Sequence, residues 1–211
     1  MLVAVSPYNN NSVEIKEIPY SHILLKRIAD VAFCILLMPI ALPLIIFGAI
    51  AMAFTSKGPI IFKQRRVGLN NIPFTMYKIR TMVHSKNGYL DHTVKDDARI
   101  TSVGQLLRKS KIDELPQLFN VLKGDMSIIG PRPERIDIVE RFAKQNKNYS
   151  LRHLIKPGIT GWAQVNKPLA TPEENLIKLE YDLYYINNHS LKLDLEILAK
   201  TVGVVKKLQS L

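Results

Sequence analysis

Residues 31–54 of the chain read VAFCILLMPIALPLIIFGAIAMAF, a run of 24 residues without a charged side chain. At about 1.5 Å per residue, a straight helix of this length would reach roughly 36 Å, which is enough to cross a hydrocarbon core of about 30 Å. Pro39 and Pro43 lie in the middle of the run. Each removes a backbone donor and clashes with the preceding turn, so we expect a strong kink or a break there. Neither half is then long enough to cross a bilayer.

Basic residues flank this run on both sides. Lys26 and Arg27 precede it, and four basic residues follow it between positions 57 and 66. Because positive residues prefer the cytoplasmic side of a membrane, both ends look cytoplasmic. We therefore expect residues 21–54 to form a re-entrant helical hairpin that enters one leaflet and returns. A bent spanning helix and a buried core helix are the alternatives. A cleaved signal peptide fits poorly, because the apolar region of a signal peptide has only about 7–15 residues and is shorter than this run.

The remaining residues suffice for one further domain. A chain of 211 residues and 24.0 kDa accommodates one core with an appendage. Hydrophobic residues make up 47% and charged residues 22%, which is typical of a globular protein and excludes a disordered or collagen-like chain. We expect residues 1–20 to be a loosely ordered leader. Residues 55–211 are expected to form a cytoplasmic domain of mostly helical α+β class with short strands.

Turn residues and helix caps outline the elements of residues 55–211. Gly58-Pro59 and the turn at 70–73 bound two short strands. Thr101 or Ser102, Thr171 and Ser190 are expected to cap three helices. The expected strands span 60–64 and 74–80, and the expected helices span 101–109, 113–122, 133–147, 171–187 and 190–207.

The formal charge of +11 is unevenly distributed along the chain. Residues 1–54 are net neutral, whereas residues 55–111 carry twelve basic and three acidic residues. This asymmetry indicates an anionic partner: nucleic acid, an anionic membrane surface or a phosphorylated substrate, with a solvated basic face as the alternative. Nucleic acid is disfavoured, because aromatic residues do not interleave with the basic stretch. The single cysteine, Cys34, excludes an intramolecular disulfide and fits a reducing compartment.

Asp113 and Glu114 form the strongest candidate site. Signatures such as G-x-G-x-x-G and H-E-x-x-H are absent, the five histidines are scattered, and Asp96-Asp97 is expected to be an exposed loop pair. Asp113 stands at a predicted helix start, where backbone donors and the helix dipole keep a carboxylate ionised. An ionised Asp can attack phosphorus, and the neighbouring Glu could hold a hard divalent cation. The alternative is that Asp113 is an N-cap and Glu114 an ordinary first-turn acid.

Six motifs, which follow one another from residue 26 to residue 166, resemble those of one protein family. They are KRxxD at 26–30, QRRVG at 64–68, YKIRTM at 77–82, DELPQLFNVLKGDMS at 113–127, GPRP at 130–133 and PGITGWAQVN at 157–166. In these motifs the chain resembles the monotopic phosphoglycosyl transferases. These bacterial sugar transferases load a sugar phosphate onto polyprenyl phosphate.

The resemblance implies a transferase with a UDP-sugar donor, a polyprenyl (undecaprenyl) phosphate acceptor and Mg²⁺ as cofactor. By motif position, Asp113 would attack the β-phosphate, expel UMP and carry a phosphosugar–aspartyl intermediate. The acceptor would then take the sugar phosphate in the second step of a ping-pong reaction. Glu114 would hold Mg²⁺. The implied phosphate-binding residues are Lys78, Arg80, Arg108 and Arg132.

The resemblance also implies a location. Residues 21–54 would be a re-entrant anchor in the inner (cytoplasmic) membrane, with the catalytic domain, 55–211, on the cytoplasmic face. The transfer of the sugar phosphate to polyprenyl phosphate would be the first membrane step of polysaccharide or glycoconjugate assembly. Besides the two substrates, the implied partners are membrane lipids, a homodimer is compatible with the family, and nucleic acid is not expected. The implied membrane-interface residues are Lys26, Arg27, Asp30, Pro39 and Pro43.

The chain departs from the family pattern in two places. Leu42-Pro43 stands where many relatives have Ser-Pro, and Lys167-Pro168 stands where relatives often have Gly-Arg. The bend angle and the sugar preference are therefore not inherited. The alternative function, from another class, is a non-catalytic, membrane-tethered basic adaptor that binds anionic lipids.

Overall fold

The computed structural model describes residue 15 and residues 20–83, 97–168 and 174–209. The mostly helical α+β class predicted from the sequence is confirmed. The elements in chain order are α1 (Tyr20–Thr55), β1 (Ile61–Val67), η1 (Leu69–Asn71), β2 (Pro73–Ile79), α2 (Ser102–Lys109), η2 (Ile112–Glu114), α3 (Gln117–Lys123), β3 (Ser127–Ile129), α4 (Ile136–Gln145), η3 (Lys147–Leu154), β4 (Gly158–Thr160), α5 (Trp162–Asn166), α6 (Asn175–Asn188) and α7 (Leu191–Gln209), where η marks a 3₁₀ helix.

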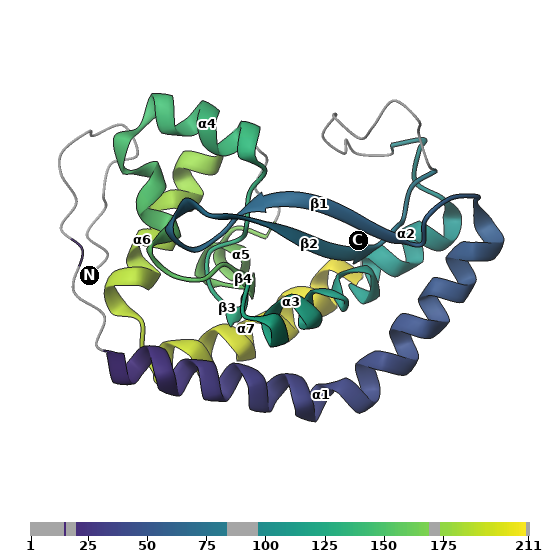
Figure 1. Cartoon of the computed structure of the whole chain (residues 1–211), viewed down its shortest axis with the longest axis horizontal. Coiled ribbons are helices and arrows are strands. Elements are labelled where there is room, and N and C mark those ends of the chain that lie inside the picture. Colours follow the sequence, from purple (N-terminus) through teal and green to yellow (C-terminus); the bar gives the residue numbers. More distant parts are fainter. Residues whose placement is uncertain (1–14, 16–19, 84–96, 169–173, 210–211) are drawn as a thin grey trace.

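The hairpin of β1 and β2 crosses the molecule above α1, with α3 between them (Figure 1). The two strands are antiparallel, with Ile61 opposite Ile79 and Val67 opposite Pro73. A second, two-stranded parallel sheet pairs β3 with β4. These strands approach closely at Gly130 and Gly158, where a Cβ atom on either glycine would collide with the backbone of the other segment. Only glycine fits this crossing, which places the Pro131–Pro133 loop beside β4.

The helix caps follow the sequence prediction wherever the structure describes them. Thr101 Oγ1 accepts a hydrogen bond from Gly104 N at 2.9 Å and so begins α2. Ser190 Oγ accepts from Leu193 N at 3.2 Å at the start of α7. Thr171 lies outside the described residues.

Two predicted helix starts are wrong. Residues 112–114 form a 3₁₀ turn, and α3 begins only after Pro116. The helix expected from residue 133 begins at Ile136, because the preceding loop is held extended by a bond from Val67 N to Glu134 O at 3.0 Å. A long-range bond thus replaces the first turn before α4, whereas local bonds from Glu114 N to Lys111 O and from Leu115 N to Ile112 O close the 3₁₀ turn before α3.

Helix α1 continues through Pro39 and Pro43 and changes direction in its middle (Figure 1). The bend follows from the donors that the two prolines remove, although the helix does not break into two. One face is buried, at positions three, four or seven residues apart. The buried positions are Asp30, Cys34, Ala41, Ile45, Gly48 and Met52. This stripe packs against the domain along most of the helix.

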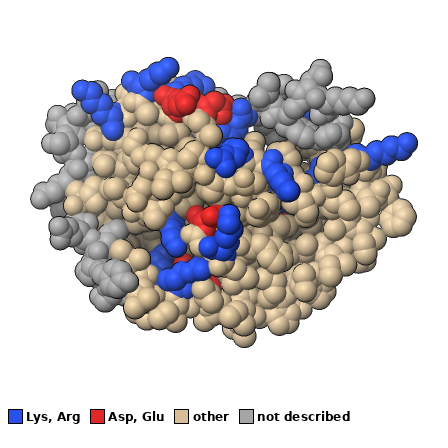
Figure 2. Space-filling view, viewed as in Figure 1, with Lys and Arg blue, Asp and Glu red and all other residues tan. Residues whose placement is uncertain are grey.

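The opposite face of α1 is apolar and exposed. Its most exposed large side chains include Phe54 at 90%, Leu36 at 77% and Phe47 at 74%. On the side shown in Figure 2, the lower edge of the molecule, where α1 lies, carries no charged side chain. By length and composition the segment His22–Thr55 could cross a membrane. An exposed apolar surface of this extent indicates membrane association.

Polar contacts fasten the first half of α1 to the domain. Lys26 pairs with Asp194 of α7 at 2.9 Å. The guanidinium of Arg27 donates to the carbonyl oxygens of Val121 and Leu122 at the end of α3, the latter at 2.7 Å. A cation at these carbonyls also opposes the negative end of the helix dipole. The two basic residues predicted at a membrane interface therefore contact the protein itself.

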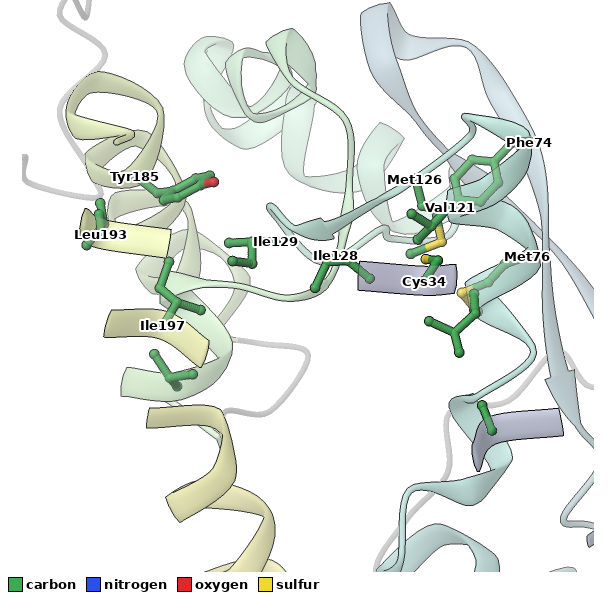
Figure 3. Packing of buried hydrophobic residues seen from close by; sticks show 13 residues of the cluster. Cys34, Phe74, Met76, Val121, Met126, Ile128, Ile129, Tyr185, Leu193 and Ile197 are labelled. Atoms are coloured by element: carbon green, nitrogen blue, oxygen red, sulfur yellow. The ribbon is translucent and has the colours of Figure 1, made fainter. Parts of the chain in front are cut away.

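Asp30 is also part of this attachment. Its Oδ1 atom accepts hydrogen bonds from Ser127 Oγ and Ile128 N, both at 3.0 Å, and the residue is only 6% exposed. The carboxylate thus joins α1 to β3. In Figure 3, Cys34, one turn further along α1, lies among Val121, Met126 and other buried side chains of the central core.

The far end of α1 is held by Arg80, which follows β2. Its guanidinium donates to Ser56 O at 2.7 Å, Pro59 O at 2.8 Å and Lys57 O at 3.2 Å. Met52 packs with Ile79 in a small core cluster. Both ends of α1 therefore contact the same folded body.

A buried ion pair supports the Pro131–Pro133 loop from below. Arg152 and Asp182 are each 1% exposed and approach to 2.6 Å. Arg152 also donates to Tyr149 Oη at 2.6 Å and to Arg132 O at 3.2 Å. The pair therefore connects α6 and η3 to the loop.

Replacing Asp182 with Ala should leave the Arg152 guanidinium buried without its charge partner. We expect the free energy of unfolding to fall by about 3–5 kcal/mol. Chemical denaturation in detergent, followed by the fluorescence of the single tryptophan, Trp162, measures the change. As a control, Glu196→Ala removes an exposed helical pair with Lys200 and should cost less than about 0.5 kcal/mol. Equal losses in the two variants would contradict the prediction.

Candidate active site

A polar cavity of about 350 Å³ lies between the β1–β2 hairpin, the start of the α2–α3 connection and the Pro131–Pro133 loop. Most of the charged side chains that line it are basic. They are Arg66, Lys78, Arg80, Arg108, Lys111, Arg132 and Arg135, and the acidic members are Asp113 and Glu114. The cavity therefore suits an anionic ligand.

A tight turn presents the two carboxylates to this cavity. Lys111 adopts a left-handed conformation with φ 60° and ψ 13°, which costs a non-glycine residue of order 1 kcal/mol. The 3₁₀ turn of η2 follows at once and carries Asp113 and Glu114. Pro116 then lets α3 begin without a wasted donor. Backbone strain at Lys111 thus helps to set the direction of both acids.

Asp113 is almost enclosed, with 7% of its surface exposed. Its Oδ1 atom is buried and has no hydrogen-bond partner among the described residues. Burial, together with the neighbouring charge of Glu114, raises the pKa of Asp113 to about 6. The sequence had indicated an ordinary ionised acid at a helix start, whereas the structure gives a partly desolvated carboxylate. Such a group is a stronger base and nucleophile once it is ionised.

Glu114 is held by two cations. Its Oε1 atom contacts Lys78 Nζ at 2.9 Å and Arg132 Nη2 at 3.2 Å. Burial alone would raise the pKa of Glu114, but these two charges lower it well below its usual range. Burial also lowers the pKa of Lys78, against the opposing effect of Glu114. The Glu114 carboxylate is therefore ionised at neutral pH. Asp113, with a pKa of about 6, titrates close to neutral pH.

The position of Lys78 relative to Glu114 depends on Asn120, a fully buried residue of α3. Its amide Nδ2 donates to Thr75 O at 2.7 Å, and its Oδ1 accepts from Tyr77 N at 3.1 Å. These bonds fix β2 against α3. They place Lys78, the next residue of β2, beside Glu114.

The four predicted phosphate-binding residues all line the cavity, but they differ in what else they contact. Lys78 and Arg132 pair with Glu114. Arg108 donates from Nε to Thr81 Oγ1 at 2.7 Å, and no hydrogen bond from its two terminal nitrogens is found among the described residues, so they can serve a ligand. The terminal nitrogens of Arg80 donate to backbone carbonyls within residues 56–59, which follow α1. Its main contribution is therefore to position residues 56–59.

Three basic residues of the cavity were not predicted as site residues: Arg66, Lys111 and Arg135. Arg66 bonds to Gln64 Oε1 and pairs with Glu134 at 3.6 Å. Arg66 could have been predicted as a site residue from its position in the QRRVG motif. Lys111 could have been predicted because it lies two residues before Asp113.

Asp97 is buried and pairs with Arg99 at 2.6 Å. The prediction of an exposed loop acid is therefore wrong for Asp97, because its carboxylate also accepts from the Arg99 backbone and closes a turn. Asp96 lies outside the described residues.

Glu114 and Asp113 fit a cation that is shared with a phosphorylated substrate. Both ion pairs of Glu114 use Oε1, which leaves Oε2 to ligate, and Oδ1 of Asp113 has no described partner. Within the described part of the chain, no three His, Cys, Asp or Glu side chains gather as a complete ligand set. Mg²⁺ commonly takes one or two carboxylates and completes its shell with phosphate oxygens and water.

A family model described as bacterial sugar transferase matches residues 21–207 of the chain. The chain belongs to the bacterial sugar transferase family. The resemblance drawn from the six motifs is confirmed.

Three curated relatives illustrate the similarity of this chain to known proteins. A UDP-N-acetylgalactosamine-undecaprenyl-phosphate N-acetylgalactosaminephosphotransferase of Aeromonas hydrophila is 43% identical over 183 residues, covering 86% of this chain and 43% of the relative. A UDP-glucose:undecaprenyl-phosphate glucose-1-phosphate transferase of Escherichia coli (strain K12) is 40% identical over 190 residues, covering 87% and 41%. An uncharacterized sugar transferase, EpsL, of Bacillus subtilis (strain 168) is 42% identical over 182 residues, covering 86% and 87%. The chain thus spans about two fifths of the first two and most of the third.

The raised pKa of Asp113 predicts that its carboxyl group makes the stability of this protein depend on pH. Because the folded protein binds this proton more tightly than the unfolded chain does, stability should fall as pH rises from about 4 to 6, and the loss is complete above pH 6. Asp113→Asn removes the buried charge, so at pH 8 we expect it to increase the free energy of unfolding by about 1–3 kcal/mol. At pH 4 the two proteins should be alike.

Thermal unfolding at both pH values, in detergent with a metal chelator, measures this difference. Asp137→Asn is the control, because Asp137 is exposed beside Arg135 and its pKa is lowered rather than raised. A melting temperature at pH 8 that is lower for Asp113→Asn than for the unmodified protein would contradict the prediction.

Proposed function

We propose that this protein transfers a sugar-1-phosphate from a UDP-sugar to undecaprenyl phosphate and releases UMP. One observation carries the proposal: a buried carboxylate, Asp113, faces a cavity lined mostly by cations and has an oxygen with no hydrogen-bond partner in the described part of the chain. A nucleophile and a binding site for a diphosphate therefore coincide. The activities for which the Aeromonas hydrophila and Escherichia coli relatives are named support the same donor and acceptor classes.

In the first step, a carboxylate oxygen of Asp113 attacks the β-phosphorus of the UDP-sugar. The bond from that phosphorus to the oxygen bridging the two phosphates breaks, and UMP leaves with the bridging oxygen. A sugar-phosphate is then bonded to Asp113. An anion must approach an anion here, so the surrounding cations, chiefly Arg108, Lys111 and Arg132, reduce the repulsion and stabilise the charge that develops on the phosphate oxygens.

In the second step, a phosphate oxygen of undecaprenyl phosphate attacks the phosphorus held by Asp113. The bond between phosphorus and the Asp113 oxygen breaks, and the carboxylate returns to its original state. The product is a diphosphate that links undecaprenol and the sugar. Because the same side chain is nucleophile and then leaving group, its pKa near 6 suits both roles.

Glu114 and Asp113 are the residues that would hold Mg²⁺, which would supply further charge neutralisation at the diphosphate when bound. The ion pairs with Lys78 and Arg132 orient the Glu114 carboxylate when no cation is bound. Lys78 therefore serves mainly to position Glu114.

We further propose that α1 lies in one leaflet of the inner membrane as a re-entrant anchor, with the catalytic domain on the cytoplasmic face. Two observations support this placement. Residues at both ends of α1 contact the same domain, and its outward face is apolar. A helix that crossed the bilayer would separate its ends by the hydrocarbon core of about 30 Å. This position would bring the lipid phosphate and the soluble nucleotide sugar to one site, as the first membrane step of polysaccharide or glycoconjugate assembly requires.

Asp113→Asn should abolish UMP release from every UDP-sugar tested, because an amide cannot form the acyl phosphate. A panel of UDP-sugars with purified protein, undecaprenyl phosphate and Mg²⁺ measures this release, and Asp137→Asn should retain normal turnover. Intact-mass analysis without the acceptor should show a sugar-phosphate adduct on the unmodified protein only. Normal turnover by Asp113→Asn would remove it as the nucleophile. No UMP from the unmodified protein with any donor would favour the lipid-binding adaptor.

Cysteine labelling tests the placement of α1. In a background with the buried Cys34 replaced by Ala, His22→Cys and Lys57→Cys put single thiols at exposed positions before and after the apolar run. In right-side-out and inverted membrane vesicles, both should react with a membrane-impermeant maleimide from the cytoplasmic side only. Labelling from opposite sides would mean that α1 crosses the bilayer.

A further inference from the structure

A second cavity, of about 420 Å³, lies on the other side of Glu114 from the polar cavity. The two cavities share Lys111, Glu114 and Arg132 as lining residues. A ligand in the second cavity would therefore approach these shared residues from the other side and leave the first cavity free. The proposed mechanism assigns the donor diphosphate to the first cavity and gives no role to the second.

The lining of the second cavity is mainly apolar, and most of its apolar side chains come from four helices. They are Phe33 and Leu37 of α1, Leu118 of α3, Ala163 and Val165 of α5, and Leu198, Val204 and Val205 of α7, with Leu115 before α3, Ile128 of β3 and Ile159 of β4. Two of its polar residues, Thr160 and Thr201, bond to each other at 2.8 Å. Such a surface favours a hydrocarbon ligand.

The charged residues of the second cavity are mostly basic. Lys111 and Arg132 lie on the edge shared with the first cavity, and Lys167 and Lys178 also contribute to the lining. A single ligand that complements both parts of the cavity is a phosphate joined to an apolar chain. Its phosphate would lie at the shared edge, next to Glu114 and within reach of the group carried by Asp113.

The cavity is continuous with the exposed apolar face of α1. Phe33 and Leu37 line it, and the neighbouring Leu36 and Ile40 on the same helix are 77% and 64% exposed. In the proposed placement of α1, this face lies in the leaflet. A lipid chain could therefore pass from the bilayer into the cavity without crossing water.

We propose that this second cavity holds the first isoprene units of the acceptor lipid, with the lipid phosphate between Lys111 and Arg132 at the shared edge. This inference rests on the proposed function and deepens it. The donor nucleotide and the acceptor chain then occupy different cavities that meet at Glu114, the residue next to Asp113. The rest of the polyprenyl chain stays in the bilayer, since the cavity has room for only a few units.

Filling the cavity should impair the second step and spare the first. Val205→Trp adds bulk at a half-buried position of the cavity wall, and Ala163→Leu does so from α5. We expect each to raise the KM for undecaprenyl phosphate about tenfold or more, while UMP release and the adduct formed without acceptor stay near normal. Val202→Trp is the matched control, because Val202 is 58% exposed on the same helix and does not line the cavity.

A short acceptor separates the chain from the phosphate. Dimethylallyl phosphate has one isoprene unit and cannot reach far into the cavity, so its KM should change little in Val205→Trp. The preference of the unmodified protein for undecaprenyl phosphate over this short acceptor should therefore shrink in the variant. Adduct formation serves as the measure of folding, because it requires an intact Asp113 site.

Two outcomes would overturn the inference. If both filled variants form the adduct and keep the normal KM for undecaprenyl phosphate, the lipid chain does not use the cavity. If they slow UMP release and leave the acceptor KM unchanged, the cavity belongs to the nucleotide. Failure of the unmodified protein to release UMP would instead reject the proposed function, and the two failures are thus distinguishable.

Discussion

The attachment of α1 to one folded body is the constraint on which the rest of the structure depends. Arg27 and Asp30 bind the backbone and side chains of α3 and β3, and Arg80 binds the carbonyls that follow α1. Buried charged groups of this kind need such partners, because an unpaired charge in the interior is very costly. The helix is therefore held at both ends, and its uncharged outer face is left to contact lipid.

The same contacts connect α1 to the part of the structure that carries Asp113 and Glu114. Arg80 belongs to the strand segment that carries Lys78, and Arg27 caps the helix that contains Asn120. Asn120 in turn joins that helix to β2. The position of Glu114 relative to Lys78 thus depends on a chain of hydrogen bonds that begins at α1. In the proposed function, this arrangement explains how a soluble donor and a lipid acceptor meet at one carboxylate pair.

Asp113 and Glu114 are adjacent in sequence, yet their environments separate their chemistry. Lys78 and Arg132 stabilise the charge of Glu114, whereas burial and that same charge raise the pKa of Asp113 to about 6. Two neighbouring acids with pKa values driven apart are a recurring way to obtain different roles from the same functional group. The buried Arg152–Asp182 pair supports the arrangement from below, because Arg152 also binds the carbonyl of Arg132.

The sequence by itself determined the features that depend on a few neighbouring residues. These include the uncharged run with its two prolines, the caps at Thr101 and Ser190, both strands of the hairpin and the identity of the Asp113-Glu114 motif. The tertiary structure alone decided that Lys78 pairs with Glu114, that Arg80 is used on backbone carbonyls, and that an apolar cavity adjoins the acids. Periodicity and caps are local, whereas these pairs join residues 21 or more positions apart, and their geometry depends on how the elements pack.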